Sequence, residues 1–294
     1  MDWRKKEKII KYILLFFALS SIIFLTGIVF VLFREGLPIF QEVGLFNFIF
    51  GEDWYPTYDP PAYGILPLLS ASLWVTFGSM VLAVPIGLAS SVYISYVLPK
   101  NLKKFVKPAI ELLAGIPSVI YGLFGMKILG PFLKDVFGLP TGLTALNASI
   151  MLGIMALPTI VSLSEDAITS IPKRYRDASL ALGGTRWETI SKVILPTASS
   201  GIVTAVILGM GRAIGETMTV LMVAGGAAAM PSSFLKPVRP MTATIAAEMG
   251  EAPVGSEHYQ ALFGIAIILF IITLTFNIVA DLASRRFKKK VSGQ

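Results

Sequence analysis

Two oppositely charged residues stand in the middle of a long apolar stretch. Arg212 and Glu216 lie about halfway along the run 197–223, which carries no other charged residue. A charge at the centre of a membrane-spanning helix costs about 2.5–3.5 kcal/mol on insertion scales, so such residues usually face a partner or an aqueous path. On one continuous helix the i, i+4 spacing places both side chains on the same face. This pair therefore marks the part of the chain best suited to recognise a polar ligand.

An arginine in this position suits an oxyanion. The Arg212 guanidinium presents a fixed fork of N–H donors that matches phosphate-type oxygens. The hydroxyls of Thr217 and Thr219 add polar groups nearby. Glu216 is compatible with phosphate in particular, because phosphate at neutral pH keeps a proton that it can donate to a carboxylate, whereas sulfate does not. Glu216 can also neutralise Arg212 when no anion is present.

A purely structural interpretation of the same residues stays open. Arg212 and Glu216 can form an internal salt bridge that locks helix packing. Gly211 and Gly215 stand four residues apart, a spacing that lets another helix approach closely.

Composition excludes several other kinds of chemistry. The chain has no cysteine, which excludes disulfides, thiolate metal ligands and cysteine nucleophiles. His258 is the single histidine, so histidine-rich metal sites and most histidine-based catalysis are not expected. The phosphate-binding loop G-x4-G-K-[ST] is absent. We therefore expect no catalytic residue, no metal site and no enzyme activity on this chain, and an energy source on another one.

The elements that position the charged pair are membrane-spanning helices. Of the 294 residues, 54% are hydrophobic and only 15% charged, against roughly 25% charged in soluble domains. We expect an all-α polytopic membrane protein, with one transmembrane domain over 1–294 and a core at about 68–284. Six apolar stretches are long enough to cross a bilayer core of roughly 30 Å. They lie at about 12–33, 68–98, 109–133, 143–163, 197–223 and 261–282.

Charge distinguishes the two sides of the membrane. The basic segments are 1–11, 99–108, 167–192 and the residues after 282. Lys and Arg collect on the cytoplasmic side, so we expect these segments and both termini to be cytoplasmic. The net charge of +7 is explained in this way, and indicates contact with membrane lipid rather than with nucleic acid. We expect 34–69 and 224–258 to form outer loops. The ionisable residues expected to face solvent there are Glu248, Glu251, Glu257 and His258.

The polar stretch 172–196 interrupts the apolar runs. Lys173 to Leu182 is predicted to form a short helix that Gly183-Gly184 terminates. Thr185 and Glu188 match the capping box T-x-x-E, so a second short helix is expected to begin next to them, within about 172–192. Two interpretations fit this pattern: a surface that docks another protein, or a solvated loop that lies on lipid head groups.

The same stretch resembles the EAA motif of ABC-importer permeases, E-A-A-x3-G-x9-I-x-L-P. Asp177 stands for the Glu of the motif, Ser179 for its second Ala and Val193 for its Ile. The resemblance implies a coupling helix that inserts into a groove on a cytoplasmic ATPase. The residues to which it assigns this coupling are Asp177, Ala178, Ser179, Gly183, Leu195 and Pro196.

The segment 211–218, GRAIGETM, resembles the G-R-A-x-G-E-T-M segment of the permeases of phosphate-specific (Pst) importers. Trp54-Tyr55-Pro56 and Tyr63 to Pro67 are similar to the outer loop of the C-type subunit rather than of its A-type partner, and Met241 to Glu248 also fits. The resemblance covers nearly the whole chain. One departure is Ala71-Ser72-Leu73, where Gly-Thr-Leu is usual.

The resemblance implies a six-helix type I ABC-importer permease with a MetI-like core, forming one half of an ATP-driven phosphate path. It implies as partners a homologous A-type permease, a dimer of ATP-binding subunits holding ATP and Mg²⁺, and an extracytoplasmic phosphate-binding protein. The location implied is the cytoplasmic membrane of a prokaryote, and no cofactor is expected on this chain. The substrate path is assigned to Arg212, Glu216, Thr217 and Thr219.

Three other functions stay open at this point. The chain can be a permease for sulfate, molybdate or another solute. It can be an ion-coupled secondary transporter in which Arg212 and Glu216 relay protons. It can also be a membrane scaffold that does not transport.

Overall fold

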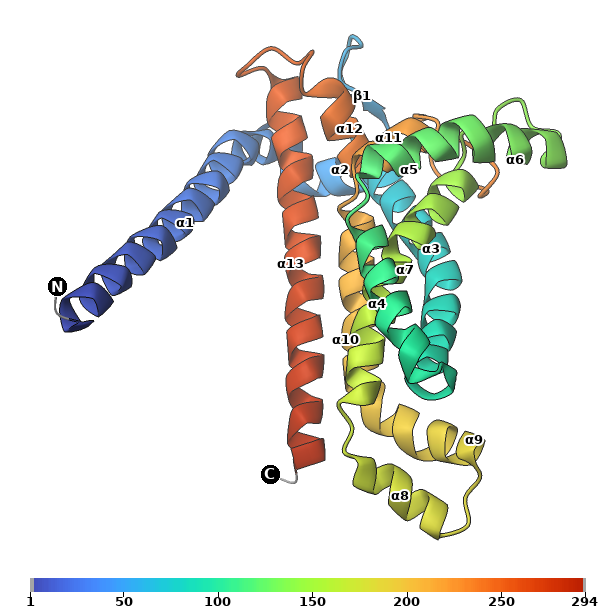
Figure 1. Ribbon diagram of the computed structural model, residues 1–294. Coiled ribbons are helices and arrows are strands. Elements are labelled where there is room, and N and C mark those ends of the chain that lie inside the picture. Colours follow the sequence, from blue (N-terminus) through green and yellow to red (C-terminus); the bar gives the residue numbers. More distant parts are fainter. Residues whose placement is uncertain (1–2, 293–294) are drawn as a thin grey trace.

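The computed structural model describes residues 3–292 and is dominated by helices (Figure 1). Within that range one antiparallel pair of two-residue strands, β1 (Trp54–Tyr55) and β2 (Ala62–Tyr63), is the only sheet. Five helical segments are long and apolar enough to cross a membrane, and a bent pair of helices supplies a sixth span if the two are counted together. The expectation of an all-α polytopic membrane protein is therefore confirmed.

Three helices form the packed centre of the chain: α3 (Leu66–Val92), α7 (Ala145–Thr169) and α10 (Leu195–Ile214). α7 is the most deeply buried of the apolar spans. Small side chains dominate the core where α3 and α7 meet, which lets the two backbones approach closely. The buried alanines of this core are Ala71, Ala83, Ala145, Ala148 and Ala156. The last long helix, α13 (Glu257–Ser292), packs against α10.

The first helix extends further than the sequence indicated. α1 (Trp3–Ile39) stands away from the centre and packs against α13 (Figure 1). It continues past Pro38 into a π-helical turn, η1 (Phe40–Gly44), and then α2 (Leu45–Phe50). The expectation of an irregular loop from residue 34 was wrong for this part. Ile39 and Phe48 are buried in a second apolar cluster. This tertiary packing stabilises helix in a segment where local propensity does not favour it.

The third expected span is not one helix. α4 (Lys100–Ala114) ends before Gly115-Ile116-Pro117, and the chain bends by 87° there. α5 (Ser118–Phe124), the π-helical turn η3 (Gly125–Leu129) and α6 (Gly130–Phe137) follow. The prediction of an unbroken span at 109–133 was wrong, because Pro117 lacks an N–H and disfavours the helical conformation at the residue before it.

The fifth expected span differs at both ends. α10 ends at Ile214, residues 215–217 lie outside any helix, and α11 (Met218–Val223) follows. At its start α10 directly continues α9 (Arg186–Glu188) and the π-helical turn η4 (Thr189–Ile194). The second polar helix is therefore the beginning of the fifth span rather than a separate element.

Short elements gather at the two ends of the helical body (Figure 1). At one end lies the hairpin, which we define as residues 172–192, including α8 (Lys173–Ala181) and α9. At the other end lie the strand pair, α2 and α12 (Met241–Glu248). We call these the hairpin end and the loop end.

Candidate functional site

Two helix breaks lie against one another inside the helical body. One is the bend between α4 and α5, and the other is the link between α10 and α11. Arg212 Nη2 donates to the carbonyl oxygen of Ala114 at 3.1 Å, and Thr219 Oγ1 donates to that of Ser118 at 2.9 Å. Side chains from one break thus satisfy backbone groups on both sides of the other. We call residues 114–118 together with 212–219 the double break.

Arg212 lies in the last turn of α10 and is half-buried. Besides Ala114, its Nη1 donates to Thr159 Oγ1 in α7 at 3.3 Å. Among the described residues, two of its five N–H donors have a partner, which leaves three to bind a ligand. The C-terminal ends of α10 and α4 both carry partial negative charge, which stabilises the cation here without an acidic partner.

The pairing of Arg212 with Glu216, which the sequence left open, is not formed. In the part of the chain that the structure describes, Arg212 makes no ion pair with any acidic side chain. The helix ends at Ile214, so the i, i+4 geometry on which the pairing depended does not exist. The internal salt bridge of the structural interpretation is therefore absent as well. Arg212 instead joins α10 to α4 and α7 through hydrogen bonds to a carbonyl oxygen and a hydroxyl.

Glu216 lies in the link itself and is half-buried. Its Oε1 accepts a hydrogen bond from the backbone N–H of Thr219 at 3.3 Å, close to the start of α11. Its own carbonyl oxygen accepts from Thr242 Oγ1 of α12 at 2.7 Å. Among the described residues, Oε2 has no hydrogen-bond partner. One oxygen of this carboxylate is therefore free to accept a proton donor.

The two threonines of the predicted path have different environments. Thr217 is half-buried, and its hydroxyl makes only a long contact of 3.4 Å to the carbonyl of Gly215. Thr219 is 0% exposed, and its hydroxyl lies between Ser118 and Met155 Sδ, the latter at 3.2 Å. In this structure Thr219 holds the two breaks together, whereas Thr217 remains accessible.

The hairpin places the residues of the predicted coupling surface in two groups. Asp177 and Ala178 are exposed on α8. Ser179 Oγ lies 2.9 Å from Thr189 Oγ1 and joins the two arms of the hairpin. Gly183 has φ +84°, a left-handed conformation that glycine adopts without strain and that ends α8. These four residues lie where a partner can reach the turn.

Leu195 and Pro196 lie at the root of the hairpin instead. Leu195 packs against a small apolar cluster that includes Ile168 and Ile194. Pro196 lies just after the π-helical turn η4 inside the continuous helical segment, where its missing N–H leaves out one helical hydrogen bond. These two residues anchor the hairpin to the membrane helices.

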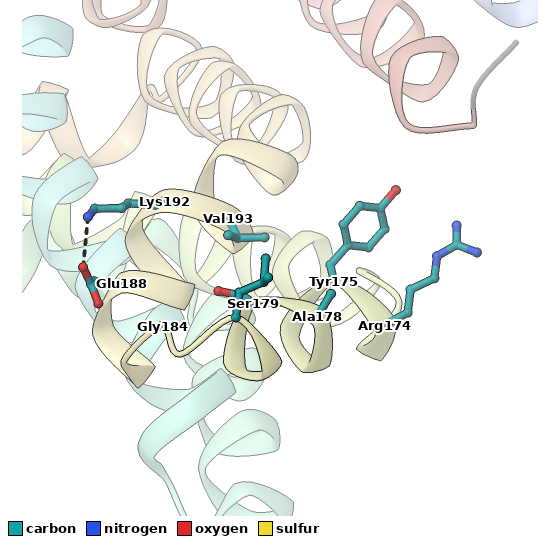
Figure 2. A pocket seen from close by; sticks show the side chains of 9 residues that line it. Arg174, Tyr175, Ala178, Ser179, Gly184, Glu188, Lys192 and Val193 are labelled. Atoms are coloured by element: carbon teal, nitrogen blue, oxygen red, sulfur yellow. Dashed lines mark hydrogen bonds and ion pairs between the residues drawn. The ribbon is translucent and has the colours of Figure 1, made fainter.

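A cavity of about 710 Å³ opens between the two arms of the hairpin (Figure 2). Glu188 and Lys192, paired at 3.0 Å, lie at one side of it, and Arg174 and Tyr175 at the other. The predicted capping box is confirmed, since Thr185 and Glu188 each accept a hydrogen bond from the other's backbone N–H. The hairpin is thus a surface built from local contacts.

The sequence interpretation missed a polar cluster at the loop end. Glu248 is largely buried and contacts three side chains: Trp54 Nε1 at 3.1 Å, Arg239 Nη1 at 2.5 Å and His258 Nε2 at 2.9 Å. The expectation that Glu248 and His258 are solvent groups was therefore wrong. This cluster joins β1, α12, α13 and the segment before α12. No local pattern marks it, because Trp54 lies 194 positions before Glu248, and Arg239 and His258 lie 9 and 10 positions from it, which matches no helix or turn spacing.

The interpretation also missed the residues that complete the double break. A signal was present in Gly115-Ile116-Pro117, since glycine and proline so close together inside an apolar run indicate a break. Thr159 and Thr242 carried no comparable signal, because a threonine inside or next to an apolar helix is ordinary. Their roles follow only from the positions of α7 and α12.

Residues 83–293 match the protein family described as the binding-protein-dependent transport system inner membrane component. The probable ABC transporter permease protein YqgH of Bacillus subtilis is 39% identical over 255 residues, which cover 86% of this chain and 82% of that protein. The phosphate transport system permease protein PstC of Pasteurella multocida is 32% identical over 294 residues, with coverage of 94% and 90%. PstC of Mesorhizobium japonicum is 31% identical, with coverage of 90% and 85%.

Solved structures share the arrangement of helices. A chain of the bacterial alginate ABC transporter, crystallised with an alginate-bound periplasmic protein, superposes with a TM-score of 0.67 at 16% identity, covering 97% of this chain and 96% of that one. A chain of the MetNI methionine ABC transporter in an inward-facing conformation gives 0.57 at 21% identity, with coverage of 74% and 93%. At these identities the likeness concerns the fold alone.

Proposed function

Because the chain belongs to the family of binding-protein-dependent transport system inner membrane components, we propose that it forms one half of the membrane path of an ATP-driven phosphate importer. The resemblance to C-type Pst permeases is confirmed by the similarity to PstC proteins along most of the chain. Those relatives are named as phosphate transport permeases, which supports phosphate as the anion. The alternatives of a scaffold and of a secondary transporter are not favoured.

The observation that carries the proposal is the double break with Arg212 at its centre. Transporters bind substrates where helices are discontinuous inside the membrane, since the freed backbone and polar side chains line a path there. With respect to the described residues, Arg212 has three N–H donors without a partner, and Glu216 has one such oxygen. An anion that carries its own proton satisfies both groups at once. Phosphate meets this description at neutral pH, and sulfate does not.

Coupling to ATP follows from the continuity of one helix. Residues Arg186 to Ile214 form an unbroken helical segment of 29 residues, with the hairpin at one end and Arg212 at the other. In the proposed mechanism, ATP closes an ATPase dimer, the dimer moves the hairpin, and this segment transmits the movement to the double break. The path then opens outward, and hydrolysis returns it to the inward-open state in which phosphate leaves.

This mechanism requires several partners. They are a homologous second permease, two ATP-binding subunits with Mg²⁺ and ATP, and an external phosphate-binding protein. The hairpin end and both termini are placed in the cytoplasm of a prokaryotic cell, and the loop end outside. The exposed Asp177 and Ala178 supply the contact with the ATPase, and Gly183 sets the turn beside it.

Reconstitution of the complex in vesicles tests the proposal. Phosphate uptake is expected only when Mg-ATP is enclosed with the ATPase and the phosphate-binding protein is outside. A non-hydrolysable ATP analogue serves as the control. Competition by excess sulfate or molybdate reports selectivity. Uptake that follows a proton gradient and ignores ATP would contradict the proposal.

Glu216→Gln tests the choice of anion. The amide still accepts a hydrogen bond, but it lacks the negative charge that rejects an unprotonated dianion. We expect the preference for phosphate over sulfate to fall about tenfold or more, because a hydrogen bond to a charged group is worth roughly 1.5–3 kcal/mol. An unchanged preference in a complex that still transports would show that Glu216 does not read the proton of phosphate.

A further inference from the structure

α4 has one polar side and one exposed apolar side. The polar side carries Lys103, Lys107 and Glu111 at intervals of four residues and ends at Ala114, whose carbonyl oxygen binds Arg212. This spacing places them along one stripe of a helix. The exposed apolar residues of α4 are Leu102, Phe105, Leu112 and Leu113. The polar stripe therefore runs along the helix towards the double break.

α7 presents a matching polar stripe to α4. Near the hairpin end, Lys103 Nζ lies 2.5 Å from Glu165 Oε1, and Lys107 Nζ lies 2.7 Å from Glu165 Oε2. Lys107 also lies 2.5 Å from Asp166 Oδ1. In the middle, Ser162 Oγ is 3.5 Å from Glu111 Oε1.

At the inner end, Thr159 of α7 meets Arg212. We call these facing stripes of α4 and α7 the polar seam. The polar seam connects the double break with the hairpin end through a series of side-chain contacts.

A cavity of about 470 Å³ lies along the α4 side of the polar seam. It is lined by Lys103, Lys104, Lys107, Pro108 and Glu111. Lys104 is exposed and, in the described part of the chain, pairs with no acidic side chain. Of the three ammonium groups of this lining, those of Lys103 and Lys107 are paired with Glu165 and Asp166, and that of Lys104 can attract an anion. Lysine is a mobile point charge and does not provide the fixed fork of arginine, so it suits passage rather than tight binding.

We infer that the polar seam is the cytoplasmic half of the anion path, so that phosphate leaving Arg212 moves along Lys107 and Lys104 to the hairpin end. Glu165 and Asp166 close this exit in the present structure, because they neutralise Lys103 and Lys107. Movement of α4 away from α7 frees both lysines and opens the exit. The inference rests on the proposed function and adds the residues that release the anion.

The phosphate group of an anionic lipid offers lysine the same chemistry. The contacts favour the transported anion. Lys103, Lys107 and Glu111 face polar side chains of α7, and the stripe ends at Arg212 rather than at the apolar side of α4. A lipid head group is not expected to enter the helical body along these contacts.

The test measures ATP-driven phosphate uptake by the complete complex in vesicles. Lys104→Gln is expected to lower the initial rate about threefold, and Lys104→Glu about tenfold, because a like charge in the lining repels the leaving anion. Lys134→Gln on α6 is the matched control, since Lys134 is another exposed lysine that lies outside the polar seam. The control is expected to transport like the wild type.

Lipid composition distinguishes the two sources of phosphate. The Lys104 effects are expected to be the same in vesicles with and without anionic lipid. Effects that vanish without anionic lipid would overturn the inference in favour of a head-group site, and so would wild-type rates for both Lys104 variants. If the wild-type complex itself showed no ATP-driven phosphate uptake, the proposed function would fail instead, so the two failures are distinguishable.

Discussion

The hairpin and the double break are both polar structures in an apolar chain, but their contacts have different origins. In the hairpin, Thr185 and Glu188 are three residues apart, and Ser179 and Thr189 are ten apart. In the double break, Arg212 contacts a residue 98 positions away, and Thr219 one 101 positions away. Water can satisfy polar groups of the hairpin that lack a protein partner, whereas lipid cannot, so the double break needs several helices at once. A docking surface can be built locally, but a path through the membrane cannot.

The largest effect is expected at the double break. Arg212→Ala should lower ATP-driven phosphate uptake about 100-fold or more, because it removes charge-assisted hydrogen bonds worth roughly 1.5–3 kcal/mol each. Arg212→Lys keeps the charge without the fork of donors, and its rate of phosphate uptake should lie between the rates of Arg212→Ala and the wild type. Co-purification of the partner subunits checks that each complex assembles. Normal uptake by an assembled Arg212→Ala complex would show that the double break does not hold the anion site.

The next effect concerns the turn of the hairpin. Gly183→Val places a branched side chain at φ +84°, which costs about 1–2 kcal/mol and favours another turn geometry. We expect uptake and transport-linked ATP hydrolysis to fall together, by about tenfold. Gly183→Asn should stay within about twofold of the wild type, because asparagine tolerates this conformation. Gly250→Ala is the matched control, since its φ is not positive and nothing lies within 4 Å of the added carbon. Equal losses for Val and Asn would show that backbone conformation is not the cause.

A smaller effect is expected where α4 meets α7. Glu165→Gln leaves Lys103 with a neutral partner and Lys107 with Asp166 alone, and should destabilise the fold by about 1–2 kcal/mol. Thermal unfolding of the purified complex in detergent measures this loss. Asp166→Asn is the matched comparison and should lower stability less, because the Asp166 side chain is largely exposed and, among the described residues, pairs with Lys107 alone. Equal shifts for the two variants would argue against the importance of burial at Glu165.

The smallest effect belongs to the capping box. Thr185→Ala removes the cap of α9 and should lower the local free energy of opening by about 1 kcal/mol. Hydrogen exchange of the backbone amides at 186–189 should become about fivefold faster, with little change in uptake. Ser191→Ala removes a hydroxyl from the same helical segment without touching the cap, and should leave these amides unchanged. Unchanged exchange in Thr185→Ala would show that the cap does not hold the hairpin.

Residues close in sequence were predicted well. The end of α8 at the glycine pair and the capping box followed from local backbone chemistry, and both are present. Most spans were found because bilayer thickness sets their length. The breaks in the third and fifth spans were missed. Continuous hydropathy does not report a bend when the residues on both sides of it are apolar.

The amino-acid sequence by itself determined that the chain is a helical membrane protein with an exposed, capped hairpin and with Arg212 and Glu216 inside an apolar run. It did so because span length, turn residues and capping depend on neighbours in the chain. Only the tertiary structure decided that Arg212 binds the end of α4 and does not pair with Glu216. It also decided that α4 and α7 form the polar seam. These contacts join residues dozens of positions apart. They depend on how α4, α7 and α10 pack, and no spacing along the chain reports that packing.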